Sequence, residues 1–98
     1  MIVVFEKFKC KPGKAKELVE KLKKSNELME KEAGRSMGRV LVDVVADYWT
    51  VIIEHEAEDL AALEREMNHR VEIEGMDEVM KGYMDLVESG SREIYKVA

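Results

Sequence analysis

The sequence predicts a single α+β domain over residues 1–98, built on a four-stranded antiparallel sheet in the order βαββαβ. Three observations lead to this fold class. An alternating apolar strand opens the chain, a long amphipathic helix follows, and the stretch from Arg39 to Met67 has the pattern of a β-hairpin that runs into a second helix. With 98 residues, the chain has room for one hydrophobic core.

The first half of the domain is a strand followed by a helix. Residues 2–9 alternate between Ile2, Val4, Glu6 and Phe8 on one face and Val3, Phe5 and Lys7 on the other. Residues 11–14 form a turn in which a proline is tolerated, and the helix is expected over residues 12–33. Gly34 ends it. Its apolar stripe at helical spacing consists of Ala15, Leu18, Val19, Leu22, Met29 and Ala33.

The hairpin is expected over residues 40–45 and 48–53, with its turn at Ala46 and Asp47. Both strands are apolar on both faces. One domain of this size has helices for only one face of its sheet, so the other face is expected to meet a second copy of the chain. The sequence therefore predicts a homodimer, with a higher oligomer left open.

The second half is a split helical region and a last strand. A helix is expected over residues 58–70, an interruption at 71–75, and a further helix capped by Asp77 that ends at Ser89 and Gly90. Residues 92–97 form the last strand. This order matches the ferredoxin-like split βαβ unit.

Composition narrows the class of protein. The formal net charge is −5, and residues 54–78 hold ten acidic residues against Arg65 and Arg70, which argues against a nucleic-acid partner. No apolar run approaches the length of a membrane helix. Cys10 is the one cysteine and is expected to be a structural thiol, and these features predict a cytoplasmic protein. The chain has no Gln and is rich in Glu and Lys, as thermophilic proteins are.

Two segments resemble a known group of proteins. The first strand with Lys11-Pro12-Gly13-Lys14-Ala15 and the long helix, and then Ile53-Glu54-His55-Glu56-Ala57-Glu58-Asp59-Leu60, are similar to the dimeric α+β-barrel superfamily. This superfamily includes antibiotic-biosynthesis-type monooxygenases, haem-degrading monooxygenases and NIPSNAP-like proteins. The C-terminal segment from Met76 to Tyr95 resembles the C-terminal segments of NIPSNAP-like proteins. The resemblance implies the fold and a dimer more than any one activity.

The resemblance does not extend to a cofactor. Haem-degrading members use an Asn, a Trp and a His, and these fall on Glu6, near Glu64 and near Glu74 in this sequence. We therefore expect no haem and no other cofactor. No metal site is expected either, because strand alternation sends His55 to the face opposite Glu54 and Glu56. His55 and His69 are both expected at the surface. The alternative for His69 is that it lines a pocket mouth with Arg65, four positions earlier, where the two would attract an anionic or phenolic group.

The residues proposed for a ligand site are polar or aromatic side chains on stretches that otherwise face inward. Glu6 is the most prominent, because it lies between Val4 and Phe8, where burial would make it a usable base. The alternative is that Glu6 forms an ion pair with Lys96 or Arg92 on the last strand. The full expected set is Glu6, Trp49 (or its neighbour Tyr48), Arg65, His69 and Tyr83.

Three functions remain open at this point. The first is a barrel that binds a small apolar or aromatic molecule between sheet and helices. The second is a cofactor-independent monooxygenase or isomerase with Glu6 as its base, and the third is an assembly or regulatory module without catalysis. A closed pocket that touches Glu6 favours the first two over the third. The sequence leaves open whether the protein is an enzyme and which ligand it takes.

Overall fold

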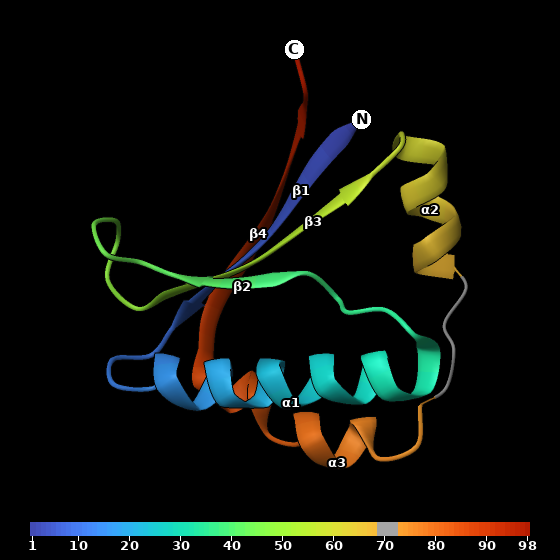
Figure 1. Ribbon diagram of the computed structural model, residues 1–98. Helices are drawn as coiled ribbons and strands as arrows, with labels where there is room; N and C mark the ends of the chain where they lie inside the picture. The colour runs from blue at the N-terminus through green and yellow to red at the C-terminus, as the bar shows by residue number, and fades with distance from the viewer. Residues whose placement is uncertain (69–72) are drawn as a thin grey trace.

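The computed structural model describes residues 1–68 and 73–98. In this part, the elements follow the expected βαββαβ order, with the second helical region split (Figure 1). They are β1 (Ile2–Cys10), α1 (Ala15–Ala33), β2 (Arg39–Val42), β3 (Thr50–Ala57), α2 (Leu60–Asn68), α3 (Met76–Met80), the 3-10 turn η1 (Tyr83–Leu86) and β4 (Val87–Lys96).

The four strands form one antiparallel sheet in the order β2-β3-β1-β4. The ferredoxin-like α+β fold class predicted from the sequence is therefore confirmed. Figure 1 shows α1 and α3 on one side of the twisted sheet and α2 beside its far end, while the opposite side carries no described helix. The two faces of the sheet thus have different environments, and we call them the helix face and the open face.

The helix face holds the core, which is divided into two clusters. Beneath α1, Leu18 and Leu22 pack against Val51 and Ile53 of β3 and Cys10 of β1. Beneath α2, the smaller cluster is formed by Ile2, Val4, Ala57 and Leu63. On β1, Glu6 stands between Val4 of one cluster and Phe8, which packs on the other. The core is divided because two separate helices, α1 and α2, cover different parts of this face.

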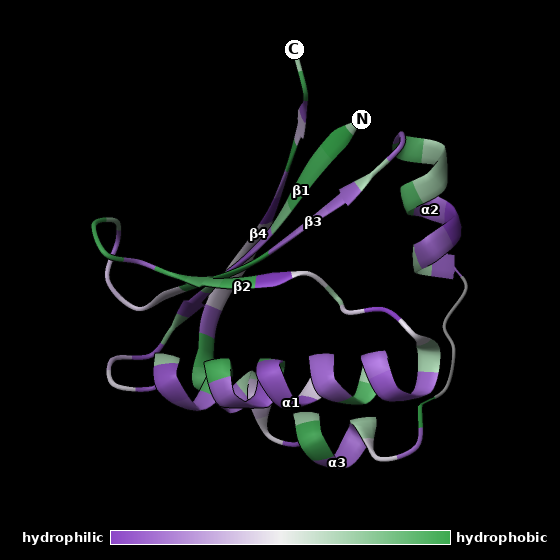
Figure 2. Ribbon diagram, viewed as in Figure 1, coloured by the Kyte–Doolittle hydropathy of each residue, from purple (hydrophilic) through white to green (hydrophobic). Residues whose placement is uncertain are grey.

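The predicted hairpin is shorter than expected, and its connection is longer. Residues 43–49 form a loop in which Val44 and Val45 are 95% and 94% exposed, so the expectation that they are buried strand residues is wrong. The loop tip is hydrophobic in Figure 2. Asp43 accepts a hydrogen bond at Oδ1 from the backbone N–H of Thr50 (3.0 Å), and Trp49 has a positive φ of 62°. A side chain that bonds nearby backbone competes with strand pairing in this way.

The C-terminal part also differs from its sequence pattern. Gly75, not Asp77, stands at the N-cap of α3, and the helix ends at Met80. Ser89 and Gly90 were expected to end a helix, but they lie inside β4, where Gly90 pairs with Phe8. A Cβ at Gly90 would lie 3.2 Å from the Lys7 carbonyl oxygen, so a glycine suits this close strand pairing. Long-range pairing with β1 therefore outweighs the local turn signal.

Helix α1 begins at Ala15, three positions later than expected, and ends as expected at Gly34. Gly34 has a φ of 73° and donates its N–H to the carbonyl oxygen of Glu30 (3.1 Å). Glu17 and Lys21 have the i, i+4 spacing of a helical ion pair, but Lys21 makes other contacts. Its ammonium donates hydrogen bonds to the carbonyl oxygens of Lys81 (2.8 Å) and Val79 (3.4 Å), and so ties α1 to the end of α3.

Candidate functional site

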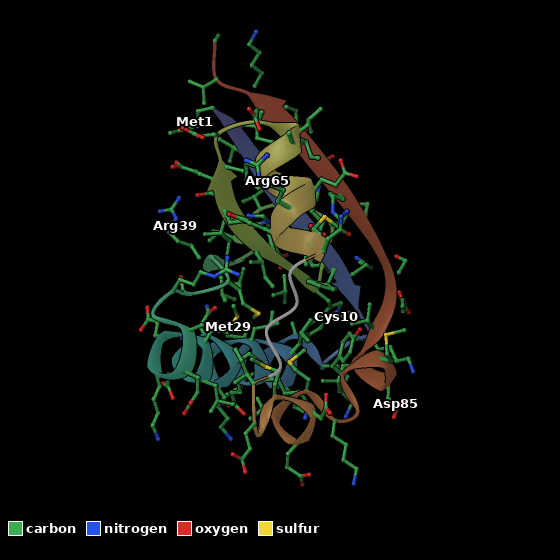
Figure 3. The ribbon with its side chains drawn as sticks, turned by 90° about the vertical axis from the view of Figure 1, so that its right-hand side faces the viewer. Met1, Cys10, Met29, Arg39, Arg65 and Asp85 are labelled. Carbon is green, nitrogen blue, oxygen red and sulfur yellow. The ribbon has the colours of Figure 1, made fainter. Side chains whose placement is uncertain are left out.

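A pocket of about 500 Å³ lies on the helix face, between the sheet, the C-terminal half of α1 and helix α2. In Figure 3, α2 stands in front of the sheet, and Met29 lies between α2 and α1. The position follows from the divided core, because the pocket opens where neither helix covers the sheet. Its lining residues are Glu6, Met29, Arg35, Ser36, Met37, His55, Glu56, Leu63, Glu66 and Met67.

Glu6 contributes a carboxylate to the pocket. It belongs to β1, which lies between β3 and β4 in the sheet. It is the cross-strand partner of Arg92, and its Oε1 accepts a hydrogen bond from Nε of Arg92 at 2.5 Å. The side chains of Glu6 and Arg92 are 26% and 44% exposed. The structure thus shows the ion pair that was the alternative interpretation of Glu6, and it also places Glu6 in a pocket.

His55 lies in the same pocket, contrary to the expected surface position. Its backbone partner in the sheet is Val4, and Glu6 pairs with Ile53, so His55 and Glu6 are diagonal neighbours on one face. His55 is half-buried and lines the pocket. The register also sends Glu54 to the open face, as alternation predicted. Glu56 pairs with Val3 and so belongs to the open face as well, although it borders the pocket beyond the last residue pair of β2 with β3.

The apolar wall of the pocket comes from three elements. Met29 belongs to α1, Met37 to the loop after α1, and Leu63 and Met67 to α2. Methionine is unbranched and polarisable, and it adapts to ligands of different shape. The Sδ of Met67 also lies 3.8 Å from Nη1 of Arg92, so this wall extends to the ion pair of Glu6.

The loop that carries Arg35, Ser36 and Met37 is held to α1 by one side chain. Asn26 accepts a hydrogen bond from the backbone N–H of Met37 (2.8 Å) and donates one to the carbonyl oxygen of Gly38 (2.9 Å). Gly38 has a φ of 136°, and a Cβ there would lie 2.4 Å from the Glu54 carbonyl oxygen. Only glycine allows the loop to approach β3 so closely. Asn26 and Gly38 together set this edge of the pocket.

The other expected site residues do not gather around Glu6. Trp49 and Tyr48 lie in the loop between β2 and β3, and Tyr83 is half-buried against the cluster beneath α1. Arg65 is exposed on α2 and is not a lining residue (Figure 3). His69 lies outside the described residues. Sequence reasoning missed Met29, Met37 and His55 as site residues, although Met29 stood in the stripe of α1 and the alternation of β3 gave the face of His55.

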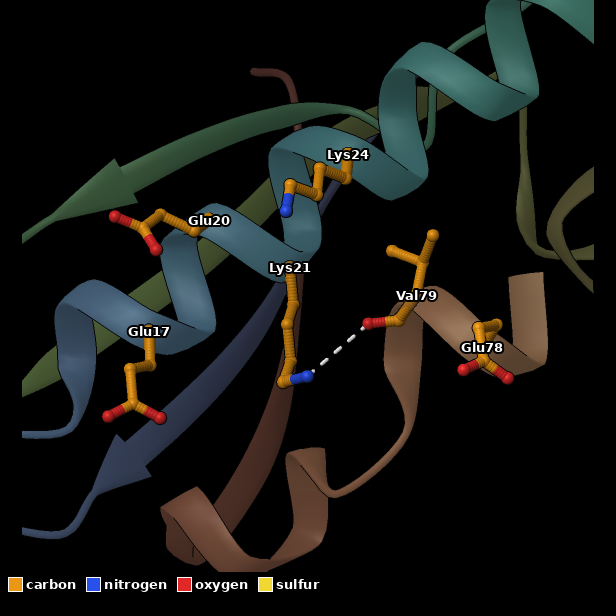
Figure 4. Close-up of a pocket in the computed structure, with 6 residues that line it drawn as sticks. All are labelled: Glu17, Glu20, Lys21, Lys24, Glu78 and Val79. Atoms are coloured by element: carbon orange, nitrogen blue, oxygen red, sulfur yellow. Dashed lines mark hydrogen bonds between the residues drawn. The ribbon is translucent and has the colours of Figure 1, made fainter. Parts of the chain in front are cut away.

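A second pocket, of about 420 Å³, lies between α1 and α3 (Figure 4). Its lining is almost entirely charged, with Val79 as the one apolar residue, and Lys21 crosses it to the Val79 carbonyl oxygen. Ligand sites are mostly apolar with a few polar groups. The pocket at Glu6 has four apolar residues in its lining, so it is closer to that character than the pocket between α1 and α3.

Cys10 is fully buried in the cluster beneath α1. Burial raises the pKa of its thiol above the ordinary value of 9.0, although the nearby Lys9 ammonium acts in the opposite direction. A thiol in this position is protonated at neutral pH and is a poor nucleophile. Within residues 1–68 and 73–98, no three His, Cys, Asp or Glu side chains are grouped as metal ligands would be. Nor does any helix in these ranges have the length and hydrophobicity to span a membrane.

Comparison with known proteins finds solved structures with a similar fold. No family model and no curated protein matches the sequence. The structure is similar to that of a NIPSNAP domain protein from Burkholderia xenovorans, with a TM-score of 0.77 and 10% identity over 100% of this chain and 95% of that chain. It is also similar to a proposed antibiotic biosynthesis monooxygenase from Nitrosomonas europaea (TM-score 0.66, 14% identity, 99% and 98% covered).

A third similar structure is PA3566 from Pseudomonas aeruginosa, with a TM-score of 0.65 and 22% identity over 99% of this chain and 94% of that chain. At such identities the likeness shows the fold alone. Two of these neighbours carry the names of groups that the sequence resembles, NIPSNAP and antibiotic biosynthesis monooxygenase, so the resemblance is confirmed at the level of the fold. What the pocket does has to be argued from its own residues.

Proposed function

We propose that this protein binds a small apolar or aromatic molecule in the pocket between the sheet, α1 and α2. The observation that carries the proposal is the pocket itself. About 500 Å³ is within the range of small-molecule sites, and the lining combines four apolar side chains with six polar or charged residues. Glu6 and His55 stand on the sheet below that apolar wall, where they are placed to orient a ligand.

The alternative is a cofactor-independent monooxygenase or isomerase with Glu6 as its base. It is supported by the similarity to the proposed monooxygenase from Nitrosomonas europaea. Glu6 lies in the pocket, as a base must, but its Oε1 is occupied by Arg92. A general base must bring a carboxylate oxygen to the proton of its substrate, and one of the two oxygens of Glu6 is held by Arg92. Binding is therefore the function that this geometry supports better.

We also propose that the chain forms a homodimer through the open face of the sheet. Val3, Phe5 and Ile52 lie on this face, and the rings of Phe5 and Tyr95 meet edge to face with centroids 5.7 Å apart. Two cross-strand ion pairs flank these residues, Lys7 with Glu93 (3.5 Å) and Arg39 with Glu54 (2.6 Å). An apolar strip with charges of both signs at its borders suits contact with a second copy of itself.

Binding can be tested with naphthylmethanol, a neutral aromatic probe, by calorimetry. Met67→Trp fills the pocket from α2 and should weaken binding about tenfold or more. Met84→Trp is the matched control, because Met84 is exposed on η1 and lies outside the pocket lining, and it should bind as the unmodified protein does. No binding, or equal binding by both variants, would refute a site in this pocket.

The dimer is tested by sedimentation of the dilute protein. A dimer of the 11.3 kDa chain that buries at least about 1,200 Å² in total is expected. A monomer would refute the open-face dimer. If the dimer forms and no probe binds, the assembly or regulatory module is the remaining interpretation.

A further inference from the structure

We infer that the pocket at Glu6 selects molecules that carry a positively charged group, such as an ammonium, on an apolar body. This inference rests on the proposed function, because it names the chemical class of the ligand for that same pocket. It departs from the expectation drawn from the sequence, in which Arg65 and His69 would have attracted an anionic or phenolic group.

The first argument is the charge of the described lining. The acidic lining residues on the helix side are Glu6 from β1 and Glu66 from α2, and the basic one is Arg35. Glu56 also borders the pocket, but it pairs with Val3, so its side chain belongs to the open face. Glu6 and Glu66 come from two different elements, so acidic residues border the pocket both on the sheet and on α2. A cavity with low-dielectric walls and charges of one sign concentrates ions of the opposite sign.

The second argument is the state of the arginines near the pocket. Arg92 is held by Glu6, and its Nη1 is turned to the Met67 sulfur. A ligand carboxylate would have to share the guanidinium of Arg92 with Glu6, and the negative charges of Glu6 and Glu66 would repel it. A ligand ammonium can approach Glu6 without breaking the pair, because a carboxylate has about four acceptor positions and Arg92 Nε uses only Oε1.

The third argument is the apolar wall. Met29, Met37, Leu63 and Met67 present thioether and methyl surface opposite the sheet. An apolar ligand body displaces water there, while its charged group stays at the partly exposed carboxylates. A small fully hydrated cation gains nothing from this wall, so the predicted ligand is amphipathic.

Three probes with one aromatic body separate charge from shape. Naphthylmethylamine is cationic, naphthylmethanol is neutral and naphthoate is anionic at pH 7. At low salt, the amine should bind about fivefold more tightly than the alcohol, and the alcohol more tightly than the acid. The preference should shrink at 0.5 M salt, because the carboxylates are partly exposed to solvent.

Glu6→Gln removes one carboxylate and releases the guanidinium of Arg92, so the amine should lose its advantage and naphthoate should gain affinity. Glu93→Gln is the matched control, because it removes the carboxylate of a similar cross-strand pair on the open face. It should leave the order of the three probes unchanged.

The outcomes separate the two proposals. If the three probes bind equally, or the acid binds best, the charge preference is overturned and the pocket proposal stands. If none of the probes binds, both are overturned. If Glu93→Gln abolishes the preference as fully as Glu6→Gln does, the preference arises outside the pocket and the inference fails.

Discussion

Glu6 and Arg92 are 86 positions apart in the chain, yet they are direct partners across β1 and β4, with Nε of Arg92 2.5 Å from Oε1 of Glu6. The pair lies on the helix face, at the gap between the two core clusters. It connects the chain's first and last strands to the pocket, so the same carboxylate takes part in sheet pairing and in the candidate site.

Glu6→Gln should change stability little. The side chains of Glu6 and Arg92 are 26% and 44% exposed, and a solvent-exposed pair contributes up to about 1 kcal/mol after screening. Urea unfolding should therefore show a loss within that range, while binding of the charged probes changes clearly. A loss of stability without any change in binding would identify Glu6 as an ion-pairing residue only.

Val51 and Ile52 are adjacent on β3 but belong to different faces. Val51 is 0% exposed beneath α1, so Val51→Asp buries a charge and should cost more than about 4 kcal/mol, enough to unfold the domain. Ile52 lies on the open face, so Ile52→Asp should leave the domain folded and shift it to the monomer. Circular dichroism and sedimentation separate the two results. A folded Ile52→Asp dimer would move the interface away from the open face.

Cys10 should react with thiol reagents only as fast as the protein unfolds, because the thiol is buried and its pKa is raised. Because the pKa of Cys10 is raised on folding, the contribution of this thiol to the free energy of unfolding depends on pH. As the pH rises past the unfolded value of 9.0, the unfolded state loses its proton first. The contribution of Cys10 to stability is thus complete below pH 9 and declines above it.

A comparison with Cys10→Ala isolates this contribution from the titration of lysines. The variant should be less stable by about 1 kcal/mol below pH 9, since it loses buried volume. The difference should narrow at higher pH. A difference that stays constant between pH 8 and 11 would show that the thiol has no raised pKa.

Asn26→Ala should loosen the edge of the pocket. It removes two hydrogen bonds to the loop of Met37 and Gly38, and leaves backbone groups unpaired at a cost of about 1–3 kcal/mol. Probe binding should weaken more than the loss of stability alone explains. Asn68→Ala, at the exposed end of α2, is the control and should have neither effect. Unchanged binding by Asn26→Ala would mean that the loop does not contribute to the site.

The protein should melt above the range of about 45–65 °C that is common for mesophilic domains. The reason is composition, because the chain has no Gln and many Glu and Lys residues that can form ion pairs. Calorimetry at neutral pH and low salt measures this directly. A melting temperature inside the mesophilic range would show the compositional argument to be wrong.

Much of the architecture follows from local patterns in the sequence. The alternation of Ile2, Val4 and Phe8 and the stripe of Leu18 and Leu22 are repeated at the spacing of a strand and of a helix, so each element and its inward face can be inferred without knowing its neighbours. The order βαββαβ and the two candidate roles of Glu6 came from the same kind of reasoning.

Only the tertiary structure decided which side chains meet. Strand register brings His55 beside Glu6, and Asn26 brings Met37 to the same pocket, while Trp49 and Tyr83 are carried elsewhere. Local signals also failed where distant pairing was stronger, as at Gly90 opposite Phe8. The physical reason is that periodicity records the preference of a segment for a face, whereas a site is made of contacts between segments that are far apart in the chain.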